Sequence, residues 1–128
     1  MTTRILLVDD CKQWRRVVHS ILEAVPDFVI VGEAGDGLEA IEKTTTLFPD
    51  IVLLDVGMPL LNGIEAAPKI MQTCPQARII FLTQEQDGEV RSAALATGAK
   101  AYLLKSNAAG ELELTIEESL QKGSGVQN

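Results

Sequence analysis

Short runs of apolar residues alternate along this chain with stretches in which apolar residues recur every three or four positions. Five runs are wholly or almost wholly apolar, at residues 5–8, 28–31, 51–54, 79–82 and 101–104. Runs of this length are typical of strands buried on both faces of a sheet. The stretches between them have the period of amphipathic helices. The alternation predicts strands that are each followed by a helix.

The first helical stretch has the clearest pattern. Its apolar residues form one stripe with the spacing i, i+3, i+4, i+7, i+8 and i+11, from Trp14 to Val25, and Pro26 is expected to end it. His19 lies in this helix and is expected to have no special role. The later helices are predicted around smaller apolar sets: Leu38, Ile41 and Phe48; Ala67, Ile70, Met71 and Cys74; Val90, Ala93 and Ala94; Leu112, Ile116 and Leu120.

Glycine and proline mark the ends of several helices. Gly37 precedes the second helix and Pro49 stops it, Pro75 closes the third, and Gly98 is well placed for a left-handed C-cap of the fourth. Pro68 falls inside the third helix, where it removes a backbone hydrogen bond. We therefore expect that helix to start late or to kink.

The element order predicts an α/β fold of (βα)5 type: a doubly wound, parallel five-stranded sheet with helices on both faces. The pattern leaves the strand order open, and 2-1-3-4-5 is the common solution. We expect one domain over residues 1–121. Residues 122–128 contain glycine and serine without periodicity, which is typical of a flexible tail or the start of a linker.

Composition and charge narrow the class of protein. Hydrophobic residues make up 46% and charged residues 23%, the balance of a soluble globular protein. No apolar run approaches the roughly 20 residues that cross a bilayer, and no signal peptide is recognisable, so we expect a cytoplasmic protein. The net charge of -7 argues against direct nucleic-acid binding. Cys11 and Cys74 lack metal or redox spacing and are expected to be unpaired thiols.

Polar residues directly follow four of the five apolar runs. They are Asp9 and Asp10, then Asp55, Thr83 and Lys105. The carboxyl ends of parallel strands lie along one edge of the sheet, where ligand sites form, so these residues should meet in one cleft. Taken singly, Asp9 or Asp10 is an ordinary helix N-cap, Thr83 is a strand-end hydroxyl and Lys105 is a surface lysine. Their common register with the strand ends favours a functional site.

The residue types in this cleft indicate phosphoryl chemistry. Carboxylates that lie close repel one another, and a hard divalent cation relieves the repulsion; Mg2+ fits such a site best. Lys105 supplies a positive charge and Thr83 a hydroxyl donor for phosphoryl oxygens. Asp55 is left as the nucleophile.

Several motifs resemble the receiver domains of two-component response regulators, which have a flavodoxin-like (CheY-like) fold. They are Leu-Val-Asp-Asp at 7–10, Leu-Leu-Asp-Val-Gly-Met-Pro-Leu-Leu-Asn-Gly at 53–63, Leu-Thr at 82–83 and Ala-Tyr-Leu-Leu-Lys at 101–105. The match runs from Arg4 to about Leu120. Residues 31–37 and 98–105 look like the NarL/FixJ (LuxR-type) branch in particular.

The resemblance implies that a sensor histidine kinase donates a phosphoryl group from a phosphohistidine to Asp55. It implies that Asp10, Asp55 and the backbone carbonyl of Gly57 bind Mg2+, with Asp9 acting mainly through water. Met58-Pro59 follows the family pattern and makes a stiff turn beside Asp55.

The resemblance also implies a switch. Thr83 and Lys105 would bind the phosphoryl oxygens, and Tyr102 would change rotamer when Thr83 moves, so that the face built from the fourth helix, fifth strand and fifth helix is remodelled. Gln84 departs from the family, in which a small residue is usual; with Glu85 it would narrow water access to the phosphoaspartate.

The family relationship leaves partners and alternatives open. A homodimer is possible within the family. NarL-like regulators generally carry a C-terminal helix-turn-helix output domain, so we expect either that such a domain has been cut away from this sequence or that the receiver acts alone. One alternative is a degenerate receiver that signals by binding alone. A phosphohydrolase would need an acid two residues after Asp55, where Gly57 stands. A flavin-binding module would need a phosphate-cradling loop where Asp9 and Asp10 stand.

Overall fold

The computed structural model describes residues 2–122, in which strands and helices alternate as predicted. The elements are β1 (Thr3–Val8), α1 (Lys12–Leu22), β2 (Phe28–Ala34), α2 (Gly37–Leu47), β3 (Ile51–Leu54), α3 (Gly63–Thr73), β4 (Arg78–Thr83), α4 (Gly88–Ala96), β5 (Ala101–Leu104), the 3-10 helix η1 (Lys105–Asn107) and α5 (Ala108–Lys122). Lys122 is the last residue of α5, and the rest of the tail predicted at 122–128 lies outside the described residues.

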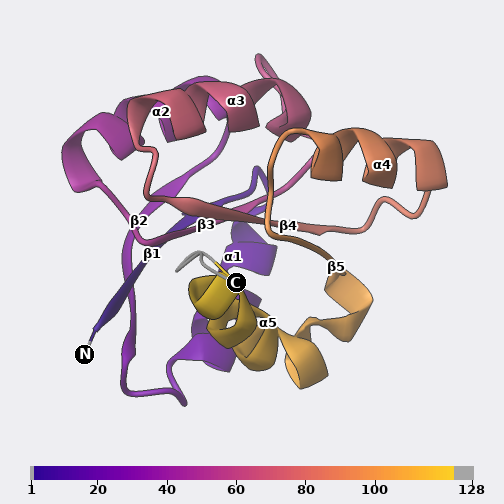
Figure 1. Ribbon diagram of the computed structural model, residues 1–128. Coiled ribbons are helices and arrows are strands. Elements are labelled where there is room, and N and C mark those ends of the chain that lie inside the picture. The colour runs from indigo at the N-terminus through magenta and orange to yellow at the C-terminus, as the bar shows by residue number, and fades with distance from the viewer. Residues whose placement is uncertain (1, 123–128) are drawn as a thin grey trace.

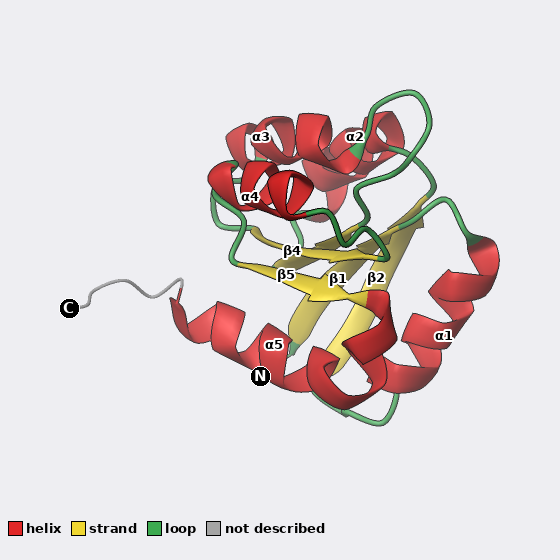
Figure 2. Cartoon of the chain, turned by 90° about the vertical axis from the view of Figure 1, so that its right-hand side faces the viewer, coloured by secondary structure: helices red, strands yellow, loops and turns green. Residues whose placement is uncertain are grey.

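The strands form one parallel sheet in the order β2-β1-β3-β4-β5, which confirms the predicted fold and strand order. Helices α2, α3 and α4 cover one face of the sheet, and α1 and α5 cover the other (Figures 1 and 2). Within residues 2–122, no helix has the length and apolar character needed to span a membrane.

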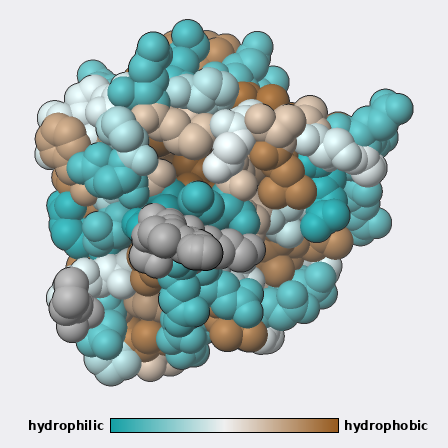
Figure 3. Space-filling view, viewed as in Figure 1, coloured by the Kyte–Doolittle hydropathy of each residue, from teal (hydrophilic) through white to brown (hydrophobic). Residues whose placement is uncertain are grey.

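The core consists of two clusters, one on each face of the sheet. Successive residues of a strand point to opposite faces, so Leu6 and Val8 of β1 pack beneath α2, α3 and α4, whereas Ile5 and Leu7 pack against α1 and α5. This explains why the strands read as unbroken apolar runs. The side shown in Figure 3 is mostly hydrophilic, with hydrophobic residues exposed in small separate groups.

Helix α1 is shorter than its apolar stripe predicts. It ends at Leu22, not at Pro26, because the chain turns over residues 23–27 and the Val25 backbone N–H donates to the Leu22 carbonyl (2.9 Å). Val17, predicted to lie on the buried stripe, is 44% exposed. Within α1, only Val18 and Leu22 are fully buried.

Helices α2 and α4 also bury less than predicted. Leu38 and Phe48 are each more than half exposed, and Phe48 lies beyond the helix with a left-handed φ of 46°. In α4, Ala94 is buried but Ala93 is exposed. The predicted left-handed glycine after α4 is confirmed, because Gly98 has φ +105° and its N–H donates to the Leu95 carbonyl.

Pro68 does not delay the start of α3. The helix begins at Gly63 behind a capping box: the Asn62 side chain accepts from the Glu65 N–H (2.9 Å), and the Glu65 carboxylate accepts from the Asn62 N–H (3.1 Å). Of the two outcomes predicted from Pro68, a late start or a kink, the late start is therefore wrong, because these reciprocal bonds satisfy the first turn independently of the proline.

Candidate functional site

Strand register brings two of the predicted site residues together. The β1–β3 pairing aligns Val8 with Leu54, so Asp9 and Asp55 leave the sheet as neighbours. The Asp55 N–H donates to the Val8 carbonyl (3.0 Å), which extends this pairing by one residue beyond the strands. The two carboxylates meet because the strands are in parallel register.

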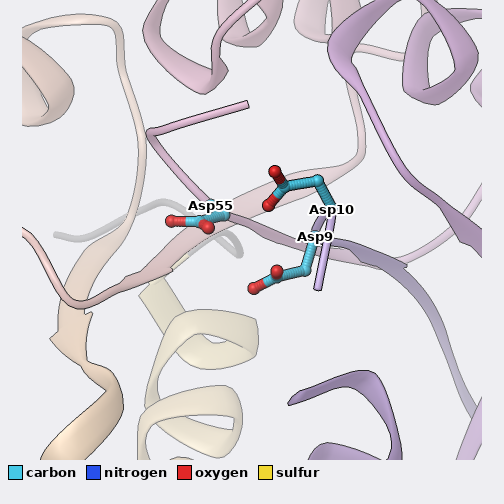
Figure 4. Close-up of side chains that lie close together, drawn as sticks. All are labelled: Asp9, Asp10 and Asp55. Carbon is cyan, nitrogen blue, oxygen red and sulfur yellow. The ribbon is translucent and has the colours of Figure 1, made fainter. Parts of the chain in front are cut away.

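Asp10 joins these residues to form an acidic cluster. One carboxylate oxygen from each of Asp9, Asp10 and Asp55 lies within 4.8 Å of the others, and Figure 4 shows the three side chains turned toward a common space. Asp9 and Asp55 are buried, whereas Asp10 is exposed. Such a group of oxygen ligands, open to solvent on one side, can hold a hard divalent cation.

Lys105 balances part of this negative charge. It directly follows β5, whose Leu104 pairs with Thr83 of β4. Its ammonium lies 2.7 Å from Asp9 Oδ2 and 3.4 Å from Asp55 Oδ2, and its side chain is only 14% exposed. Burial works against the ammonium, but the hydrogen bond to Asp9 and the charges of both aspartates outweigh it and raise the pKa of Lys105.

The charged form of Asp9 is unfavourable even with Lys105 beside it, and the pKa of Asp9 is raised. Its burial, aided by the nearby charge of Asp55, raises its pKa more than Lys105 and the Cys11 N–H lower it. The Cys11 N–H donates to Asp9 Oδ1 at 2.8 Å. A buried carboxylate in this condition is stabilised by a cation, so the residues present fit a divalent metal ion.

Asp55 opens onto a cleft of about 550 Å3. The cleft is lined by Asp55, Val56, Gly57, Thr83, Gln84, Glu85 and Gln86. This cleft therefore brings together three residues of the predicted site: Asp55 as the nucleophile, Gly57 as the carbonyl ligand and Thr83 as the hydroxyl donor. Gln84, the residue that departs from the family pattern, is exposed at the rim of that space.

Tyr102 does not line this cleft but is linked to it through Glu85. The Tyr102 hydroxyl donates to the Glu85 carbonyl (2.8 Å), and the Glu85 N–H donates to Thr83 Oγ1 (3.3 Å). Thr83 is buried, while the Tyr102 ring packs near Phe81 with the guanidinium of Arg91 5.8 Å from its centroid. Glu85 thus connects the site to the surface of α4 and β5.

Two residues of α1, Trp14 and Arg15, make contacts at the site that were not predicted from the sequence. The Lys105 ammonium lies over the Trp14 ring, 5.2 Å from its centroid. Arg15 donates to the backbone carbonyl of Asp9 (2.5 Å) and to Glu33 (2.7 Å), which ties α1 to the end of β1 and to β2. No sequence motif signals these contacts, because all of them depend on how α1 packs against the sheet. Both cysteines are free, as predicted, with Cys11 exposed and Cys74 buried.

Comparison with known proteins gives the family. Residues 5–117 match the model of the response regulator receiver domain. The chain belongs to this family.

Two kinds of full-length protein contain similar segments. The chain is 39% identical over 117 residues to a protein-glutamate methylesterase/protein-glutamine glutaminase of Thermotoga maritima, covering 90% of this chain and 33% of that protein. It is 38% identical over 109 residues to the transcriptional regulatory protein LiaR of Bacillus subtilis, covering 85% of this chain and 52% of LiaR. The chain thus spans a third to a half of these relatives, and the matched part is a signalling module.

Solved structures agree with the fold and the family. A LuxR-family two-component response regulator from Aurantimonas sp. SI85-9A1 superposes with a TM-score of 0.90 at 36% identity, covering 95% of this chain and 87% of that one. The response regulator domain of Thermotoga maritima CheB superposes with a TM-score of 0.88 at 34% identity and covers both chains completely, 100% of each.

Proposed function

We propose that this chain is a phosphorylation-activated switch in which a sensor histidine kinase transfers a phosphoryl group to Asp55 in a Mg2+-dependent reaction. One observation carries the proposal. The Asp55 carboxylate opens onto a cleft, belongs to an acidic cluster that can hold a cation, and lies 3.4 Å from the ammonium of Lys105. This arrangement suits an anionic nucleophile that must accept an anionic group.

The side chains have distinct roles in the proposed transfer. A carboxylate oxygen of Asp55 attacks phosphorus, the bond from phosphorus to the donor nitrogen breaks, and an acyl phosphate forms. Magnesium bound by Asp9, Asp10, Asp55 and the Gly57 carbonyl would supply charge neutralisation. Lys105 moves from its carboxylate partners to a phosphoryl oxygen, and the Thr83 hydroxyl donates to another.

The switch uses the hydrogen bonds that join Thr83, Glu85 and Tyr102. When Thr83 turns toward the phosphoryl group, the Glu85 N–H loses its acceptor at Thr83 Oγ1. The segment at Glu85 then shifts, and Tyr102, which donates to the Glu85 carbonyl, changes its position. The α4-β5-α5 face is remodelled as a result, and output contacts form there.

The wider role we propose is that of a receiver in a transcriptional response regulator. LiaR is a transcriptional regulatory protein, and LuxR-family response regulators are among the similar structures. The net charge of -7 argues against direct DNA contact by this chain, so we assign DNA contact to a C-terminal output domain and kinase contact to the receiver.

The central test measures phosphorylation by intact mass. The protein is incubated with acetyl phosphate, with and without Mg2+, beside Asp55→Asn and the control Asp27→Asn, which alters an exposed aspartate in the turn before β2. We expect the wild type and the control to gain one phosphoryl group only with Mg2+, and Asp55→Asn to gain none. Absence of any gain in the wild type, beside a receiver that is labelled, would favour a degenerate receiver that acts by binding alone.

A further inference from the structure

Trp14 lies beside the ammonium of Lys105, which in the proposed reaction binds a phosphoryl oxygen. It belongs to the first turn of α1, which begins directly after the acidic residues at the end of β1. Its ring is partly buried against the core cluster beneath α1 and α5. The start of α1 therefore brings one face of an indole ring to the carboxyl edge of the sheet, beside the acidic cluster.

The Lys105 ammonium is held from two directions. Carboxylate oxygens of Asp9 and Asp55 lie 2.7 and 3.4 Å away, and the centroid of the Trp14 ring lies 5.2 Å away. A cation this close to an indole face is attracted by the ring, most strongly where water is excluded. The Lys105 side chain is 14% exposed, so little water competes with the ring.

The indole N–H of Trp14 indicates that a tryptophan is present here for a reason other than core packing. Trp14 Nε1 is buried and has no hydrogen-bond partner among the described residues. An unsatisfied buried donor is unfavourable, and a leucine or phenylalanine of similar apolar area would avoid it. Core packing alone does not favour tryptophan here, whereas contact between the ring face and the Lys105 ammonium does.

We propose that Trp14 is a positioning residue for Lys105: its ring holds the ammonium beside Asp55, at the place from which it reaches an incoming phosphoryl group. This inference rests on the proposed phosphorylation of Asp55. The ring does not touch the reacting atoms. It restricts the lysine side chain, which otherwise has many rotamers, and so lowers the entropy lost when the phosphoryl group is bound.

The test compares Trp14→Leu with Trp14→Phe, each with Lys105 present and in a Lys105→Met background. Acetyl phosphate with Mg2+ is the donor, and the rate of labelling is read by intact mass. With Lys105 present, we expect Trp14→Leu to slow labelling about two- to fivefold, while Trp14→Phe, which keeps a ring face, stays closer to the wild type. In the Lys105→Met background, neither Trp14 substitution should slow labelling further.

Equal loss in both backgrounds would mean that Trp14 acts by packing alone and would overturn the proposal, as would an unchanged rate in Trp14→Leu. A second readout needs no phosphoryl transfer. Trp14 is the only tryptophan, so its emission should change when Lys105→Met removes the ammonium over the ring; unchanged emission would also overturn the proposal. If the wild type is never labelled, the proposed function fails, and the emission comparison still decides whether the contact exists.

Discussion

The ammonium of Lys105 lies 3.4 Å from Asp55 Oδ2, although 50 positions separate the two residues in the sequence. The same ammonium lies nearer to Asp9, at 2.7 Å. Lys105 is therefore an internal counter-ion of the acidic cluster. Any cation that binds the carboxylates competes with it for the same oxygens.

We predict that Lys105→Met strengthens Mg2+ binding while it slows phosphorylation. Removal of the competing ammonium frees oxygens of Asp9 and Asp55 and leaves more negative charge in the cluster. If the partly buried pair is worth about 1 kcal/mol, the dissociation constant for Mg2+ falls about fivefold. Titration calorimetry measures this, with Lys69→Met, on the exposed side of α3, as the control for net charge. Weaker binding in Lys105→Met would show that Lys105 supports the metal site instead of competing with the metal.

Asp9→Asn should stabilise the protein when Mg2+ is absent. Burial, with the nearby Asp55, raises the pKa of Asp9, so its charged form is unfavourable in the folded state despite Lys105. Asparagine removes that charge and still offers an oxygen to the Cys11 N–H. We expect a gain on the order of 1 kcal/mol, which corresponds to about 4 °C in Tm for a domain of this size.

Thermal unfolding at neutral pH, in EDTA and then in excess Mg2+, checks this prediction. The wild type should gain stability from Mg2+, and Asp9→Asn should gain much less because it has lost a charged member of the cluster. Asp27→Asn removes the same charge from an exposed turn and should change neither value. A lower Tm of Asp9→Asn in EDTA would mean that its ion pair with Lys105 outweighs burial and repulsion.

The fold was predictable because the three central strands, β1, β3 and β4, are buried on both faces, whereas the edge strand β2 is only partly buried. Alternate residues such as Leu6 and Leu7 enter different core clusters, so no polar residue interrupts the run. The residues that follow the strands could also be placed at one edge of the sheet, because the carboxyl ends of parallel strands lie along the same edge whatever the side chains are. The convergence of Asp9, Asp55 and Lys105 follows from that register.

Contacts that depend on how a helix packs against the sheet were not predictable from the sequence. The apolar stripe of α1 gives its general orientation, but not that Val17 is exposed or that Lys105 lies over Trp14. Likewise, Pro68 alone predicts a late start or a kink of α3, but the capping box between Asn62 and Glu65 holds the start of the helix at Gly63. Local sequence signals, such as a proline and a capping box in the same helix, can predict different structures, and the contacts in the folded protein determine which one forms.

The ion pairs between α1 and β2 make stability depend on pH. Partial burial works against the charged form of Glu33, but hydrogen bonds from His19 and Arg15 outweigh it and lower its pKa in the folded state. A lowered pKa means that the unfolded chain binds the proton more readily. The stabilisation is therefore present above the unfolded pKa and is lost as pH falls through the folded pKa.

Glu33→Gln should accordingly cost stability at neutral pH and little at strongly acidic pH. The side chain is 37% exposed, so solvent screening limits the expected loss, and we expect about 0.5 kcal/mol. Urea unfolding across a pH series measures the difference from the wild type. Glu117→Gln removes the same charge from the exposed side of α5 and provides the control. A difference that does not vary with pH would exclude an electrostatic origin.

Gly63 fixes the loop that carries the proposed phosphoacceptor. A Cβ at this position would lie 2.0 Å from the Asp55 carbonyl oxygen and 2.9 Å from its carbonyl carbon. The Gly63 N–H donates to the Val56 carbonyl (2.9 Å), so the start of α3 closes directly onto the residues that follow β3. Any side chain here must push the Asp55 backbone away from its place.

We predict that Gly63→Ala destabilises the protein by about 1–3 kcal/mol, because the obstacle is backbone and not a flexible side chain. It should also slow the labelling of Asp55 by acetyl phosphate, since the carboxylate moves relative to Lys105. Gly110→Ala is the matched control: it lies in α5, a Cβ there meets nothing within 4 Å, and the helix should gain up to about 1 kcal/mol. Urea unfolding and intact mass measure the two effects. Normal labelling in a Gly63→Ala protein of reduced stability would mean that the loop shifts without carrying Asp55, and that Gly63 serves the fold alone.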